Sequence, residues 1–75
     1  MNNEVIVDAI GQACPMPVIL TAKAMKDLAP GQVMVVKATD AGARSDIPSW
    51  VEMTGNELVG VDEQGAVLLF SIRKT

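Results

Sequence analysis

A single cysteine and a complete lack of histidine limit how this chain of 75 residues can be held together. One cysteine allows no disulfide within the chain, and without histidine the usual zinc sites and the Ser-His and Cys-His dyads are excluded. The chain is also close to the smallest size at which one hydrophobic core offsets the loss of chain entropy. We therefore expect a single domain over residues 1–75, without a metal or any other cofactor.

The charge balance argues against nucleic acid as a direct partner. Six basic and nine acidic residues leave a net charge of −3 and an isoelectric point of about 4.6, whereas phosphate contacts need a basic surface. The longest apolar run, residues 66–70, is far too short to span a membrane. Because the first residues lack the features of a signal peptide and an unpaired thiol suits a reducing compartment, we expect a cytoplasmic protein.

Hydrophobic periodicity and turn residues predict six elements along the chain. They are a strand over 4–9, a helix over 15–28, a strand over 33–38, a helix over 46–55, and strands over 57–62 and 66–73 joined through 63–65. Ser45 or Asp46 is the expected cap of the second helix, Pro48 lies in its first turn, and Gly55 closes it. The last two strands are expected to form an antiparallel hairpin.

This order of elements predicts an α/β fold, a two-layer α/β sandwich. Right-handed crossovers place both helices on one face of a mixed four-stranded sheet. Alternation along the strands is expected to turn Val33, Val35, Val67 and Leu69 away from the helices. The resulting apolar sheet face favours either a monomer or a weak homodimer.

The first helix is predicted to have two different apolar faces at 3.6 residues per turn. The core stripe is expected at Val18, Ala22, Met25 and Leu28 or Ala29. The opposite side carries Met16, Ile19, Leu20 and Lys23. We expect the latter four residues to form an exposed patch that docks partner proteins; surface scatter and a more widely buried helix are the alternatives.

Cys14 is the candidate centre of function, because it lies where the first strand gives way to the first helix. Free N–H groups and the macrodipole at a helix start favour a thiolate. Pro15 is expected at the first helical position, and Pro17 removes another donor, so Met16 and Val18 remain to offer N–H groups. We expect a moderately lowered thiol pKa. A buried structural cysteine is the alternative.

Asp40 and Arg44 follow the second predicted strand, and the ends of parallel strands meet at one edge of a sheet. Both are therefore expected near Cys14. Arg44 is a candidate for holding an anion on the sulfur or a partner carboxylate, although a solvated loop charge is the simpler interpretation. Asp46 is expected to be a helix cap and Trp50 to be a core residue.

The chain resembles the TusA family of sulfur carriers, also called SirA-like proteins, over almost its whole length. The resemblance rests on Val7-Asp8-Ala9-x-Gly11-x-x-Cys14-Pro15-x-Pro17-Val18, Ala38-Thr39-Asp40, Ser45-Asp46-Ile47-Pro48-x-Trp50, Thr54-Gly55-Asn56-Glu57-Leu58 and Ile72-Arg73-Lys74. It implies a two-layer α/β sandwich in which Cys14 accepts sulfur from a cysteine desulfurase or a similar donor. Cys14 then carries the sulfur as a persulfide and passes it to an acceptor protein, with Gly11, Pro15 and Pro17 supporting the motif.

Three positions depart from the pattern of many relatives that act in tRNA thiolation. Met16 stands where they have an acidic residue, Ala22 precedes a solitary Lys23 where they have a basic pair, and Val51 replaces a second cysteine found in some members. The resemblance therefore leaves the pathway open between tRNA 2-thiouridine synthesis, molybdenum-cofactor sulfuration, sulfur oxidation and selenium metabolism. A non-catalytic redox or interaction module is a further alternative. Whether a sulfurtransferase-type carrier is called an enzyme is a matter of convention, because such a protein carries sulfur between enzymes.

Overall fold

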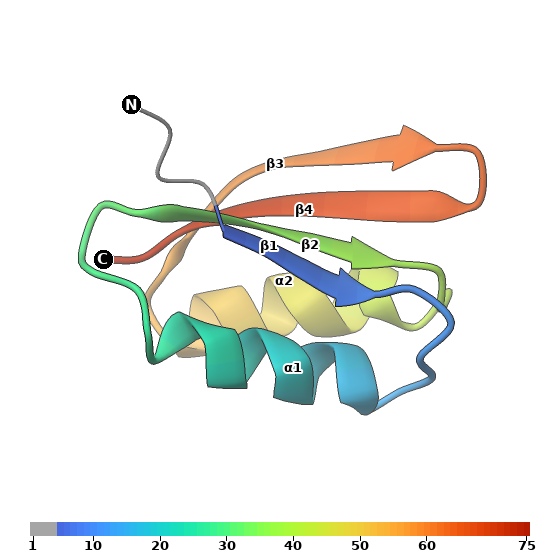
Figure 1. Cartoon of the computed structure of the whole chain (residues 1–75), viewed down its shortest axis with the longest axis horizontal. Helices are drawn as coiled ribbons and strands as arrows, with labels where there is room; N and C mark the ends of the chain where they lie inside the picture. The colour runs from blue at the N-terminus through green and yellow to red at the C-terminus, as the bar shows by residue number, and fades with distance from the viewer. Residues whose placement is uncertain (1–4) are drawn as a thin grey trace.

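The computed structural model describes residues 5–75 and contains six elements in the order β-α-β-α-β-β. They are β1 (Val5–Ala9), α1 (Met16–Met25), β2 (Val33–Ala38), α2 (Ala43–Met53), β3 (Glu57–Gln64) and β4 (Val67–Arg73). Figure 1 shows both helices side by side beneath one face of the sheet. Residue 4 of the first predicted strand lies outside the described residues. Among the described residues, no helix combines the length and the apolar character needed to cross a bilayer.

The strands form one mixed sheet in the order β1-β2-β4-β3. β1 pairs with β2 in parallel, and β4 pairs antiparallel with both β2 and β3. A helical crossover joins the parallel pair, as the geometry of parallel strands requires. The predicted two-layer α/β sandwich is confirmed.

The core lies between the sheet and the helices and follows the two-residue period of the strands. The strands supply the residues Val7, Ala9, Met34, Val36, Ala38, Leu68, Phe70 and Ile72, all of them buried. Ile47 and Val51 of α2 pack against them, and Trp50 is half-buried at the edge of the same cluster. The alternate strand positions Val33, Val35, Val67 and Leu69 lie on the opposite face and are half-buried, as predicted. Whether this face pairs two copies stays a prediction.

The inward face of α1 differs from the predicted stripe by one position. Pro17, Thr21 and Met25 are buried, whereas Val18 and Ala22 are half-buried. A threonine can occupy the core here because its Oγ1 donates a 2.7 Å hydrogen bond to the carbonyl of Pro17, so the buried hydroxyl is satisfied. The helix also ends at Met25, and only residues 26–27 continue as a turn.

α2 begins at Ala43, earlier than the predicted start at 46–48. The early start places Ala43 and Ile47 on one buried face of the helix. Burial of these two side chains therefore outweighs the preference of Pro48 for the first turn of a helix. Pro48 consequently lies inside the helix, and Gly42 rather than Ser45 or Asp46 occupies the N-cap position.

The hairpin turn is shorter than predicted. β3 runs to Gln64, which pairs with Val67, and the turn consists of Gly65 and Ala66 alone. Gly65 has a φ of 63°, in the left-handed region that tight hairpin turns need. The predicted connection through 63–65 is therefore wrong, because pairing with β4 extends β3 as far as geometry allows.

Candidate functional site

The side chain of Cys14 is exposed in the loop between β1 and α1. Its Sγ donates a hydrogen bond of 3.1 Å to Oδ2 of Asp46, in the first turns of α2. The alternative of a buried structural cysteine is therefore wrong. The thiol is accessible to a reagent or a partner protein and is held by one specific contact.

Hydrogen bonds from the backbone shape the loop that presents the thiol. Gly11 has a φ of 80°, a conformation that favours glycine, and its N–H donates a 2.9 Å bond to Oγ1 of Thr39. Gln12 N–H donates to the carbonyl of Ala9 at 3.1 Å. The loop after β1 is thereby joined to the loop after β2, which places the segment containing Asp40 beside the segment containing Cys14.

The start of α1 differs from the prediction. Pro15 occupies the N-cap position rather than the first helical position, and the peptide bond between Cys14 and Pro15 is cis. The N–H of Met16 donates to the carbonyl of Ala13 at 2.9 Å, and Pro17 has no N–H to offer. The first turn of α1 therefore supplies less stabilisation to a thiolate than the sequence suggests.

The pKa of the Cys14 thiol is raised rather than lowered. The main cause is the hydrogen bond to Asp46, followed by loss of hydration and by the negative charges of Asp46 and Asp40. A carboxylate accepts a bond from the protonated thiol but repels the thiolate. The predicted pKa depression is wrong, because the hydrogen bond to Asp46, the loss of hydration and the two negative charges all favour the protonated thiol.

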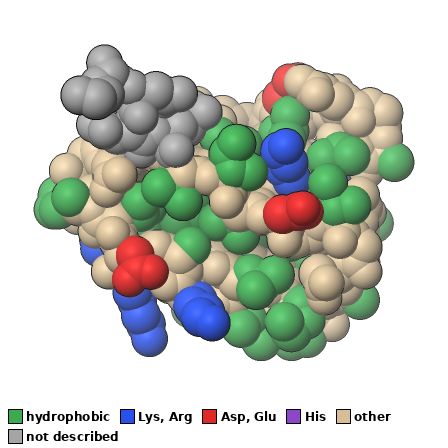
Figure 2. All heavy atoms as spheres, in the orientation of Figure 1, with side chains coloured by type: hydrophobic (Ala, Val, Ile, Leu, Met, Phe, Trp, Pro, Cys, Tyr) green, Lys and Arg blue, Asp and Glu red, His purple; other side chains and the backbone are tan. Residues whose placement is uncertain are grey.

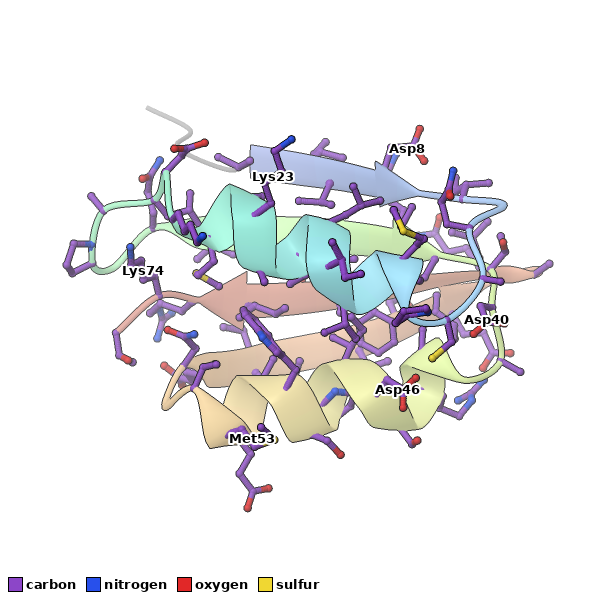
Figure 3. The ribbon with its side chains drawn as sticks, turned by 90° about the horizontal axis from the view of Figure 1, so that it is seen from below. Asp8, Lys23, Asp40, Asp46, Met53 and Lys74 are labelled. Carbon is purple, nitrogen blue, oxygen red and sulfur yellow. The ribbon has the colours of Figure 1, made fainter. Side chains whose placement is uncertain are left out.

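Asp40 and Asp46 converge at the N-terminus of α2. A Cβ placed on Gly42 would lie 2.9 Å from Oδ2 of Asp40 and 3.6 Å from Oδ2 of Asp46, so the missing side chain leaves room for both carboxylates. Figure 3 shows the two aspartates at the same end of the molecule. The positive end of the α2 macrodipole favours negative charge at this place. Within residues 5–75, no three side chains of the His, Cys, Asp or Glu type are arranged to hold a metal ion.

The structure brings Asp40 close to Cys14 but gives Arg44 a different partner. Nη2 of Arg44 forms a 3.0 Å ion pair with Oε1 of Glu63, and both side chains are 59% exposed. The guanidinium therefore ties α2 to β3. From the sequence, Asp40 is expected near Cys14 because it follows β2 at the edge of the sheet, whereas Asp46 is expected only as a helix cap. Asp46 also follows β2 at that edge, and this position was the signal for its contact with the thiol.

The predicted patch on α1 is partly present. Met16 is 38% exposed and Ile19 is 49% exposed, and Lys23 is exposed on the next turn. Leu20 instead is half-buried and packs against the core, so its assignment to the exposed patch is wrong. Figure 2 shows hydrophobic side chains gathered over the first half of α1 and basic side chains over its second half.

Comparison with known proteins gives a consistent result. The family model described as Sulfurtransferase TusA matches residues 5–74. YrkI of Bacillus subtilis, a candidate sulfur carrier protein by name, is 42% identical over 74 residues, which cover 99% of both chains. YrkF of the same organism, named in the same way, is also 42% identical over 74 residues, but the chain spans 40% of its length.

Two further relatives extend the comparison. Sulfur carrier protein TusA of Pseudomonas paraeruginosa is 42% identical over 71 residues, which cover 95% of this chain and 90% of the relative. The crystal structure of the SirA-like protein from Desulfitobacterium hafniense superposes with a TM-score of 0.81 at 28% identity, over 92% of this chain and 95% of that one. Sequence and fold thus agree, and this chain belongs to the TusA family, whose structures include SirA-like proteins.

Proposed function

We propose that this protein is a sulfur carrier that holds sulfane sulfur as a persulfide on Cys14. The observation that carries the proposal is the exposed thiol of Cys14, placed within the Cys-Pro-x-Pro motif at the start of α1. Family membership supports it, since relatives of nearly the same length are named sulfur carrier proteins. Gly11, Pro15 and Pro17 support the site by shaping the loop and the first turn of the helix.

The chemistry is exchange at sulfur. Cys14 loses its proton and attacks the outer sulfur of a donor persulfide; a new S–S bond forms on Cys14, and the donor's S–S bond breaks. The donor's inner sulfur leaves as a thiolate and takes up the proton. An acceptor thiol later removes the outer sulfur from Cys14 in the same way. No metal, nucleotide or organic cofactor takes part in these steps.

The exposed side of α1 is the proposed docking patch, defined here as Met16, Ile19 and Lys23. The three residues follow at intervals of three and four, so they share one side of the helix, on the element that follows the thiol. Methionine gives such a contact adaptability. The proposed partners are a cysteine desulfurase or another donor protein, and an acceptor in tRNA 2-thiouridine synthesis or a related pathway of the cytoplasm.

Intact-mass measurement tests the proposal. The protein is incubated with a cysteine desulfurase, pyridoxal phosphate and cysteine, and is analysed without reductant. The wild type should gain one sulfur atom, and Cys14→Ser should gain none. An unchanged mass of the wild type contradicts the proposal and favours a redox or interaction module. Uptake of selenium in preference to sulfur, when both are supplied, identifies a selenium carrier instead.

A further inference from the structure

The thiol of Cys14 lies beside two carboxylates. Asp46 accepts its hydrogen bond, and Asp40 adds a second carboxylate over Gly42. The guanidinium of Arg44, which lies on the first turn of α2, is directed to Glu63. The two side chains that act on the thiol are carboxylates, which accept hydrogen bonds and repel an anion on the sulfur.

We propose, building on the sulfur-carrier function above, that Asp46 sets how strongly Cys14 retains sulfur, by stabilising the empty thiol and opposing the loaded persulfide. Asp40 contributes in the same direction through its charge. The carrier is thereby tuned to release sulfur to an acceptor rather than to store it.

The empty state gains from Asp46 because the protonated thiol is the hydrogen-bond donor. The carboxylate has no proton of its own to offer a thiolate, so the contact exists only while sulfur keeps its hydrogen. The same hydrogen bond raises the pKa of the Cys14 thiol. The N-terminus of α2 favours the negative charge that makes Asp46 a strong acceptor.

The loaded state loses this contact. Once a second sulfur is bonded to Cys14, the inner sulfur carries no hydrogen and cannot donate to Asp46. The outer sulfur of a persulfide is more acidic than a thiol, so at neutral pH it is an anion beside the carboxylates of Asp46 and Asp40. The exchange converts the Cys14 thiol and a donor persulfide anion into the Cys14 persulfide anion and a donor thiol. Atoms and charge balance in this exchange. The hydrogen bond from the thiol and the repulsion of the persulfide anion both shift the equilibrium toward the carrier without bound sulfur.

The alternative is that Asp46 merely ties the β1–α1 loop to α2. Asp46→Asn separates the two interpretations, because the amide oxygen still accepts a bond from the thiol while the negative charge is gone. A tie between loops predicts no change in sulfur retention. Asp46→Ser serves as a second neutral variant if the Asn protein folds poorly, and Asp46→Glu keeps the charge.

The test is an exchange equilibrium with a small donor. Each protein is equilibrated with glutathione persulfide and glutathione at a fixed ratio, quenched by alkylation and measured by intact mass. We expect Asp46→Asn to raise the loading constant about three- to tenfold, because a neutral acceptor holds the thiol less strongly than a carboxylate and does not repel the persulfide anion. Asp40→Asn should raise it less, and Asp27→Asn, at the other end of α1, should match the wild type. A loading constant for Asp46→Asn equal to or below that of the wild type overturns the proposal.

A second readout needs no sulfur donor. The alkylation rate of the empty thiol is followed against pH, and its midpoint should move to lower pH in Asp46→Asn. A midpoint that does not move overturns the role of Asp46. A wild type that takes no sulfur from any donor contradicts the sulfur-carrier function itself, and the two failures are therefore distinguishable.

Discussion

Sγ of Cys14 and Oδ2 of Asp46 lie 3.1 Å apart although 32 positions separate the two residues in the chain. The contact requires both the loop after β1 and the start of α2 to be in place, so it exists only in the folded protein. Folding therefore changes how firmly the thiol holds its proton.

This contact predicts a pH dependence of stability. Because the folded state raises the pKa of the Cys14 thiol, it binds the proton more tightly than the unfolded chain. The stabilisation is fully present below the ordinary thiol pKa of about 8.5 and is lost as the pH rises through the folded value. We expect the free energy of unfolding to fall more steeply above about pH 8.5 in the wild type than in Cys14→Ser, whose hydroxyl does not titrate there. Denaturant titrations at several pH values measure the difference, and parallel curves contradict it.

The docking patch predicts a change in sulfur transfer without loss of the fold. Ile19 is 49% exposed, so Ile19→Glu leaves the core intact while placing a charge in the proposed interface. We expect transfer from a desulfurase to slow by about tenfold, equal to ~1.4 kcal/mol of contact energy. Met53→Glu is the matched control, because Met53 is 83% exposed at the far end of α2 (Figure 3). Equal rates for the two variants would remove the patch from consideration. Leu20→Glu is unsuitable, since Leu20 packs against the core.

Lys74 predicts a stability effect at the opposite end of α1. Its Nζ donates to the carbonyl oxygens of Met25 at 3.1 Å and Leu28 at 2.7 Å, just after the last turn of the helix, where a cation also complements the macrodipole. Lys74→Met should lower the free energy of unfolding by about 1–2 kcal/mol. Lys26→Met changes an exposed lysine nearby and should stay within ~0.5 kcal/mol of the wild type. Urea titration gives both values, and similar losses for the two variants would argue against the capping role.

Substitution of Gly55 is expected to lower the stability of the fold through backbone conformation alone. Gly55 follows α2 with a φ of 75°, its N–H donates to the backbone carbonyl of Glu52 at 3.2 Å, and an added Cβ would meet nothing within 4 Å. Gly55→Ala should therefore lower the free energy of unfolding by about 1–2 kcal/mol through conformational strain. Gly60 has equally open surroundings without a positive φ, so Gly60→Ala should leave stability unchanged or slightly higher. Thermal unfolding of both variants checks the contrast.

The order of strands and helices and the position of the functional cysteine are predictable from the sequence, because both follow from patterns among neighbouring residues. The β-branched runs of β1 and β2 and the order of the elements lead to the mixed sheet, and the Cys-Pro-x-Pro motif leads to Cys14. Helix starts and turn lengths are less predictable. Ala43 begins α2 because burial overrides the local signal of Pro48, and β3 continues to Gln64 because pairing with Val67 extends it up to the turn at Gly65.

The sequence by itself determined the fold class, the presence of a single thiol within the Cys-Pro-x-Pro motif, and membership of the family. Only the tertiary structure decided which groups surround that thiol. Helix-start arguments treat Cys14 with its own segment and predict a lowered pKa, but packing of α2 against the sheet brings Asp46 and Asp40 to the sulfur and raises it. Contacts between distant segments depend on the phase and start of each helix, and the burial of the whole core sets those.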